Sequence, residues 1–224
     1  MLNKDLYVMI YIYERNEADS LMIERAEELL SKERWEKLKK YKFQREKELC
    51  FTSFQLLRYG LAKEYGMYSI PEICVGEYGK PYLRDTSVFF NISHCDNSVL
   101  CSISRSETGA DIQDYREDMQ SISSKILSEG ESHVIARRKL IENQELVRFW
   151  TLKEAYGKYY GFGLGYNFAS MDFSSVKSDD EPQSYDGLTV FSKCFERYAV
   201  SVFSDEPLKF GVVSASELYA AFMK

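Results

Sequence analysis

The chain has 224 residues, of which 45% are hydrophobic and 29% are charged, and its formal net charge is −6. This composition is typical of a folded globular protein, and the acidic balance argues against nucleic-acid binding. The longest apolar run covers residues 6–13, far short of the roughly 20 residues that a membrane span needs, so no membrane association is expected. Because the N-terminus lacks the order of a signal peptide, the sequence predicts a cytoplasmic protein.

The first part of the chain is expected to begin with a strand and to continue with helices. Residues 6–13 are rich in Val, Ile and Tyr, which favours a strand. Residues 18–65 carry apolar side chains at helical spacing, so they are expected to be helical, with one break near residues 42–44. After a connection, further strands are expected at residues 73–75, 88–93 and 98–104.

The second part is expected to combine the same kinds of element. A short strand is predicted at residues 110–113, after the Thr-Gly break. The helical pattern then covers residues 119–129, 131–143 and 145–160. A polar loop at residues 174–187 precedes strands expected within residues 188–203 and 209–214. Because both parts combine helices with antiparallel strands, the sequence predicts an α+β fold with a boundary near residues 104–110.

A basic cluster stands out in this acidic chain. Residues 32–47 hold eight Lys or Arg and three Glu, a local net charge of +5. Such a cluster is either the solvated face of a helix or a site for a small anionic ligand or an acidic partner. Charge alone leaves both interpretations open.

Asp111 and Gln113 stand two positions apart on an expected strand, so both side chains leave the same face. Two oxygen donors in this arrangement can hold one hard cation such as Mg²⁺, while water and phosphate supply the other ligands. An edge strand whose polar side chains face water would give the same pattern. The five cysteines contain no CxxC spacing and the chain has two histidines, so neither a disulfide framework nor a zinc site is indicated.

Trp150, Glu154 and Lys158 lie four residues apart and form one stripe on an expected helix. The Glu and Lys either stabilise an exposed helix or act together, with a carboxylate that holds a metal or accepts a proton and a cation that neutralises phosphate charge. Glycines at 161, 163 and 165 follow, and they either cap the helix or let the backbone approach a ligand. His94, at a strand end, either contacts phosphate or is structural.

In order and spacing, four segments resemble the 4′-phosphopantetheinyl transferase family, in particular its larger, pseudodimeric type. The segments are GKPYL at residues 79–83, FNISHC at 90–95, GADIQ at 109–113 and FWTLKEAYGKYYGFGL at 149–164. The last is the most specific, because W-x-x-K-E-x-x-x-K is the hallmark of the family.

The resemblance implies a magnesium-dependent enzyme that transfers the 4′-phosphopantetheine arm of coenzyme A to a serine of an apo acyl or peptidyl carrier protein. Adenosine 3′,5′-bisphosphate is released. The resemblance also implies a metal held by Asp111, Gln113 and Glu154. Catalysis would be carried out by Glu154, as acceptor of the serine proton, together with Lys158. The residues that it implies for coenzyme A binding are Arg34, Lys37, Lys80, Pro81, Ser93, His94 and Lys158.

The resemblance also implies a particular organisation. Two similar halves, residues 1–107 and 108–224, would each consist of a small antiparallel sheet packed on a long helix, with the active site in the cleft between them. The first half would hold the phosphates of coenzyme A, and the second would carry the metal and the catalytic residues. A monomer with an internal pseudo-twofold axis, serving secondary-metabolite synthetases, is expected.

Two departures from the family pattern keep an alternative open. Gln113 stands where the family usually has Glu, and an amide oxygen carries no charge. Leu49 or Cys50 falls where the family has an Arg, for which Arg45 or Lys47 are candidate substitutes. A catalytically impaired relative, which binds coenzyme A or a carrier protein without transfer, would fit these changes.

Overall fold

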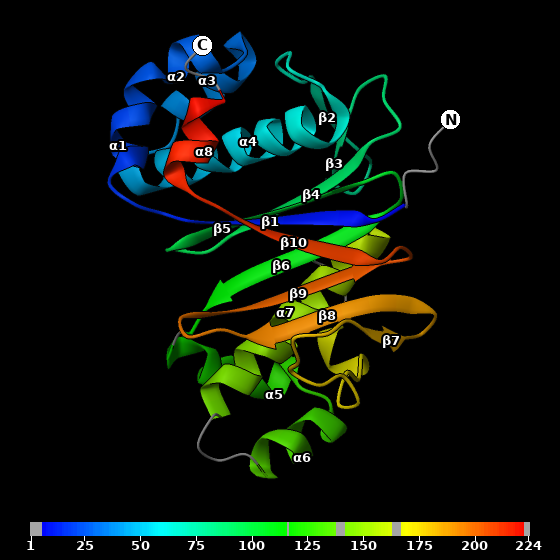
Figure 1. Ribbon diagram of the computed structural model, residues 1–224. Coiled ribbons are helices and arrows are strands. Elements are labelled where there is room, and N and C mark those ends of the chain that lie inside the picture. The colour runs from blue at the N-terminus through cyan, green and yellow to red at the C-terminus, as the bar shows by residue number, and fades with distance from the viewer. Residues whose placement is uncertain (1–5, 116, 138–141, 163–166, 222–224) are drawn as a thin grey trace.

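The computed structural model describes residues 6–115, 117–137, 142–162 and 167–221. Figure 1 shows two four-stranded sheets in the middle of the molecule, with the first group of helices above them and the second group below. The α+β class with small antiparallel sheets and helices is therefore confirmed. The division at residue 107 stays a prediction. None of the described helices is long and apolar enough to cross a membrane.

The N-terminal helical region is confirmed with its break before residue 44, and it has a second break at residues 30–31 that the sequence did not predict. The expected helical stretch consists of α1 (Ala18–Met22), η1 (Ile23–Arg25), α2 (Ala26–Leu29), α3 (Lys32–Lys39) and α4 (Gln44–Tyr65). Ser31 caps α3 by accepting a hydrogen bond from the backbone N–H of Arg34, which satisfies a free donor of the first turn. Helix α4 ends at Gly66, whose φ of +68° is easily reached only by a residue without a side chain.

The first four-stranded sheet contains strands from both ends of the chain. Its order is β10 (Leu208–Val213), β1 (Val8–Glu14), β5 (Ser98–Ser104) and β4 (Phe89–His94). Strand β10 lies parallel to β1, and the other neighbours are antiparallel. Helix α8 (Ala215–Ala220) follows β10 and packs against α4. A separate hairpin of β2 (Ile73–Val75) and β3 (Pro81–Leu83) stands beside β4.

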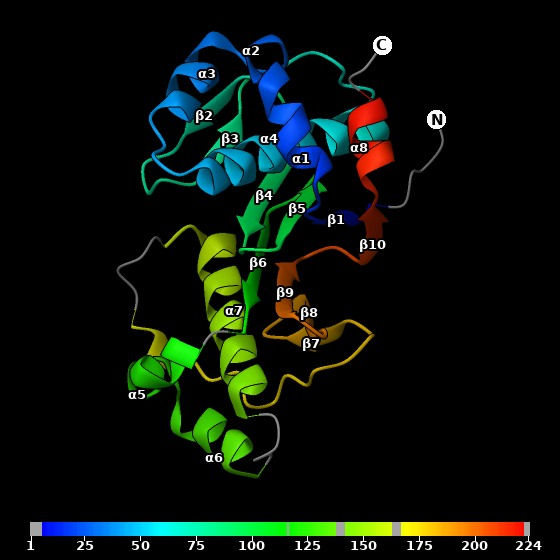
Figure 2. The same cartoon turned by 90° about the vertical axis from the view of Figure 1, so that its left-hand side faces the viewer.

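The second sheet is antiparallel throughout, and one long helix covers it. Its order is β6 (Thr108–Asp114), β9 (Tyr198–Ser204), β8 (Leu188–Cys194) and β7 (Gln183–Tyr185). Figure 2 shows helix α7 (Glu142–Tyr160) running alongside β6. The described part of the connection between β6 and α7 contains η2 (Glu117–Ile122), α5 (Ser123–Ile126) and α6 (Glu129–Arg137). The helix predicted at residues 119–129 is thus divided into shorter elements, and residues 138–141 of the helix predicted at 131–143 lie outside the described residues. The turn η5 (Phe168–Ser170) follows α7.

Three apolar cores hold these layers together. One lies under α4 and includes Phe51, Phe54 and Leu57, and a second lies under α7. The third lies between the two sheets, where Ile10 of β1 and Ile112 of β6 belong to one buried cluster. Burial of this apolar surface drives the joining of the two sheets.

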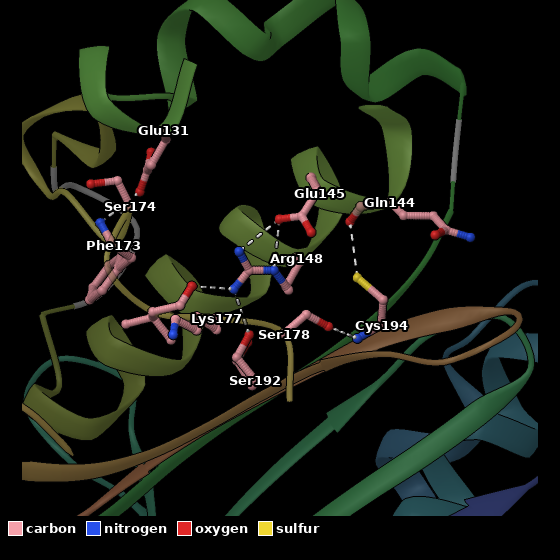
Figure 3. A network of polar contacts seen from close by, with 12 residues as sticks. Glu131, Gln144, Glu145, Arg148, Phe173, Ser174, Lys177, Ser178, Ser192 and Cys194 are labelled. Carbon is pink, nitrogen blue, oxygen red and sulfur yellow. Dashed lines mark hydrogen bonds and ion pairs between the residues drawn. The ribbon is translucent and has the colours of Figure 1, made fainter. Parts of the chain in front are cut away.

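Beneath α7, a buried network of polar contacts fixes the first turns of the helix to the second sheet (Figure 3). The guanidinium of Arg148, 1% exposed, donates to Glu145 Oε2 at 2.7 Å and to Ser192 Oγ of β8 at 3.2 Å. It also donates to the carbonyl oxygen of Val176 at 3.1 Å. A charge without water must find such partners within the protein.

Replacing Arg148 by Met is expected to lower the free energy of unfolding by about 3 to 5 kcal/mol, because the buried carboxylate of Glu145 then loses its ion pair with the guanidinium. Urea denaturation followed by circular dichroism measures the change. Lys39→Met is the matched control, since it breaks an ion pair with Glu36 whose side chains are about half exposed, and it should cost at most about 1 kcal/mol. Equal losses of unfolding free energy in the two variants would contradict the stabilising role of the buried Arg148 ion pair.

Candidate active site

A cavity of about 220 Å³ lies where the β2–β3 hairpin and strand β4 face α7. It is lined by Tyr78, Gly79, Lys80, Pro81, Asn91, Ile92, Glu154, Gly157, Lys158, Gly161 and Phe168. Three of the four sequence segments singled out above, from residues 79–83, 90–95 and 149–164, therefore meet around one cavity. The fourth, from residues 109–113, lies directly beneath it on β6.

Helix α7 can lie directly on β6 because Gly109 has no side chain. A Cβ atom at residue 109 would stand 2.1 Å from the carbonyl oxygen of Ala155 and 2.3 Å from the backbone nitrogen of Tyr159. Position 109 thus faces the helix. Since side chains alternate along a strand, Asp111 and Gln113 share that face, as the spacing predicted.

Asp111 is the centre of the polar contacts beneath the cavity. Its Oδ1 atom lies 2.6 Å from Lys158 Nζ and accepts a hydrogen bond of 2.6 Å from Ser93 Oγ. Lys158 also donates to Ser93 Oγ at 3.2 Å. The three side chains come from β6, α7 and β4, so the site draws on both sheets and on the long helix.

The second oxygen of Asp111 is buried and accepts no hydrogen bond in the part of the chain that the structure describes. Burial raises the pKa of Glu154, and the negative charge of Asp111 raises it further, against the opposing effect of Lys158. An unpaired carboxylate oxygen and a second carboxylate close to it match the donor set of a hard cation. The described residues contain no group of three or more His, Cys, Asp or Glu placed to hold a metal, so these two carboxylates would need additional ligands.

Lys80 and Pro81 line the cavity, and Lys80 is held in place. Its Nζ atom lies 2.6 Å from Glu107 Oε2 and donates to the carbonyl oxygen of Tyr159 at 3.1 Å, which ties the hairpin to the end of α7. Gly161, with φ of +72°, ends that helix. Gly163 and Gly165 lie outside the described residues.

His94 lies at the end of β4 and is accessible to solvent. Desolvation of its ring by the surrounding protein lowers the pKa of His94, and the positive charge of Lys158 lowers it further. A histidine with a lowered pKa is mostly neutral at neutral pH, so it would act on a phosphate as a hydrogen-bond donor rather than as a cation.

Arg34 and Lys37 lie away from this lining. They border a separate, small cavity between α3 and α4, together with Cys50. The Arg34 guanidinium stacks over the ring of Phe54, 4.0 Å from its centre, and burial lowers its pKa. The role of both residues in phosphate binding stays a prediction.

Asn91 is a site residue for which the sequence suggested no role. Its Oδ1 atom accepts a hydrogen bond of 3.1 Å from the backbone N–H of Ala110, which joins the two sheets beside the cavity. The sequence did contain a signal for this role, because an amide side chain that becomes buried within a strand needs a hydrogen-bond partner. Its partner, however, belongs to a different sheet, and a single sequence does not show that pairing.

Gly109→Ala is expected to destabilise the protein towards the upper end of the roughly 1 to 3 kcal/mol typical of overpacking, because the new methyl group would meet the backbone of α7. The matched control is Gly157→Ala on the same helix, where a Cβ atom meets nothing within 4 Å. Its stability should rise by up to about 1 kcal/mol through helix propensity. Thermal unfolding of both variants checks this, and a neutral Gly109→Ala would contradict the close contact.

Comparison with known proteins agrees with these features. The profile of the 4′-phosphopantetheinyl transferase superfamily matches residues 107–207. The chain is 28% identical over 189 residues to a 4′-phosphopantetheinyl transferase of Bacillus subtilis, covering 83% of this chain and 82% of the relative. It is 27% identical over 163 residues to the 4′-phosphopantetheinyl transferase Sfp of Bacillus subtilis strain 168, covering 71% of each.

Another relative matches a shorter stretch of the chain at a higher sequence identity. The 4′-phosphopantetheinyl transferase gsp of Aneurinibacillus migulanus is 37% identical over 91 residues, which are 39% of this chain and 37% of that relative. Asp111, Glu154 and Lys158 all lie inside the matched profile, so the part of the chain that carries the candidate site is similar to the 4′-phosphopantetheinyl transferase superfamily. Alignment with Sfp over most of both chains is consistent with the larger type that the motifs indicated.

Proposed function

We propose that the protein transfers the 4′-phosphopantetheine arm of coenzyme A to the serine hydroxyl of an apo acyl or peptidyl carrier protein. The observation that carries this proposal is the meeting of Asp111, Glu154 and Lys158 beside one cavity, with Asp111 and Lys158 2.6 Å apart. Similarity to the 4′-phosphopantetheinyl transferases supports the same reaction. The impaired relative is disfavoured, because these three residues are intact.

In the proposed reaction, the serine oxygen attacks the phosphorus that carries pantetheine, and the bond from that phosphorus to the bridging oxygen breaks. Adenosine 3′,5′-bisphosphate leaves. Glu154 accepts the serine proton as a general base. Lys158, at the cavity wall, offsets the negative charge of the diphosphate.

A magnesium ion fits the donors on this face of β6 and α7. The buried, unpaired Oδ2 atom of Asp111 and the carboxylate of Glu154 would hold it, with the amide oxygen of Gln113 as a further ligand. When bound, Mg²⁺ would neutralise charge on the diphosphate. Two protein carboxylates suffice for Mg²⁺, since water and phosphate usually complete its shell.

The proposed partners follow from this reaction. Coenzyme A is the donor, and a carrier protein of a peptide or polyketide synthetase is the acceptor. We propose that the protein acts as a monomer in the cytoplasm, where secondary-metabolite synthetases are loaded. Lys80, Pro81, Ser93 and His94 are the proposed contacts of coenzyme A around the cavity.

Glu154→Gln is expected to lower transfer at least a hundredfold, because the amide accepts no proton and binds a cation weakly. The assay incubates the protein with coenzyme A, Mg²⁺ and a panel of apo carrier proteins, and records the carrier mass. Trp35→Phe, a conservative change on α3 outside the cavity lining, serves as a control. Full activity in folded Glu154→Gln would rule out this role.

Chelation of divalent ions is expected to abolish transfer, and added Mg²⁺ should restore it. Gln113→Glu is expected to lower the Mg²⁺ concentration that gives half of the maximal rate, because a carboxylate replaces a neutral ligand. Mg²⁺ titration of the initial rate measures this. An unchanged half-saturating concentration would place residue 113 outside the metal site.

A further inference from the structure

The cavity lining combines charged and apolar side chains. Lys80, Glu154 and Lys158 are its charged members, and Ile92, Pro81 and Phe168 supply non-polar surface. Among these apolar residues, Phe168 belongs to the short turn η5, in the segment after α7. Its ring packs edge-on against Trp150 of α7, with the ring centres 5.3 Å apart.

A buried ion pair holds the backbone of this turn. Lys153 Nζ donates to the carbonyl oxygens of Phe168 and Met171, each at 2.8 Å, and lies 2.7 Å from Glu131 Oε2. Both charged side chains are fully buried. Glu131 also accepts a hydrogen bond of 3.0 Å from the backbone N–H of Phe173, toward which it points in Figure 3.

Such an arrangement fixes geometry more than it adds stability. Removing a lysine and a glutamate from water is costly, and apolar residues of similar volume often stabilise a core better. All three donors of Lys153 have acceptors, and two of these are carbonyl groups of one short segment. The ion pair therefore sets the position of residues 168–171 relative to Glu154, the next residue on α7.

We propose that Phe168 packs against the non-polar chain of the pantetheine arm of coenzyme A, and that Lys153 is the positioning residue that holds Phe168 there. The proposal rests on the proposed function. In coenzyme A, a carbon bearing two methyl groups follows the diphosphate closely, so a donor whose diphosphate lies at Lys158 presents apolar surface within the same cavity.

Calorimetric titration with two ligands tests the contact. Phe168→Ala is expected to weaken the binding of coenzyme A roughly three- to tenfold and to leave adenosine 3′,5′-bisphosphate, which lacks the arm, unchanged. Phe210→Ala on β10 is the matched control, since Phe210 is 39% exposed and does not line the cavity. Unchanged coenzyme A binding, or equal weakening of both ligands, would overturn the contact.

A double-mutant cycle tests the positioning role. Lys153→Met should weaken coenzyme A binding as Phe168→Ala does, and should add nothing in the Phe168→Ala background. Additive losses would show that Lys153 does not act through Phe168. If Lys153→Met does not fold, Glu131→Gln takes its place in the cycle, because it removes the charge that holds Lys153 and keeps the side-chain volume.

The carrier assay separates this inference from the proposed function. Wild-type protein that modifies carriers, together with full coenzyme A affinity in Phe168→Ala, would retain the function and overturn the role of Phe168. Wild-type protein that binds coenzyme A and modifies none of the carriers would count against the function, while the two-ligand comparison still decides the contact.

Discussion

The site depends on the close approach of helix α7 to strand β6. Gly109 and the buried Ala155 leave the two backbones in contact, because neither residue places a large side chain between them. Lys158 stands about one turn after Ala155, so it reaches Asp111, two residues after Gly109. A glycine with no chemistry of its own thus sets the distance between the two charged groups that the proposed reaction needs.

The interface between the sheets sets the electrostatics of the same site. Most of it is apolar, but beside the cavity it carries two polar bonds, from Ala110 to Asn91 and from Ser93 to Asp111. A carboxylate placed at the border of such a core loses water on one side while it faces the cavity on the other. Glu154 reaches the same cavity from α7, and its own burial, followed by the charge of Asp111, raises its pKa.

The sequence predicted what depends on local periodicity. Asp111 shares a strand face with the helix-facing Gly109, and Glu154 lies in the cavity with Lys158, because alternation and the helical repeat determine these faces. The sequence did not predict pairings between distant segments, such as the parallel pairing of β10 with β1. The basic cluster shows the same limit, since its charge was evident but its position beside a different cavity depends on tertiary packing.

The hallmark motif contains two lysines with opposite surroundings. Lys153 and Lys158 are five positions apart, so their side chains leave different sides of α7. Lys153 is fully buried with three short bonds, and exchanging any of them for a ligand would leave a carbonyl group or a glutamate unpaired. Lys158 is 28% exposed, and its bonds to Ser93 and Ala110 are 3.2 and 3.4 Å long. A phosphate oxygen can replace those weaker partners at little cost, and a cation on Asp111 would release the lysine further. One helix therefore supplies a fixed cation for the architecture and an exchangeable one for the ligand.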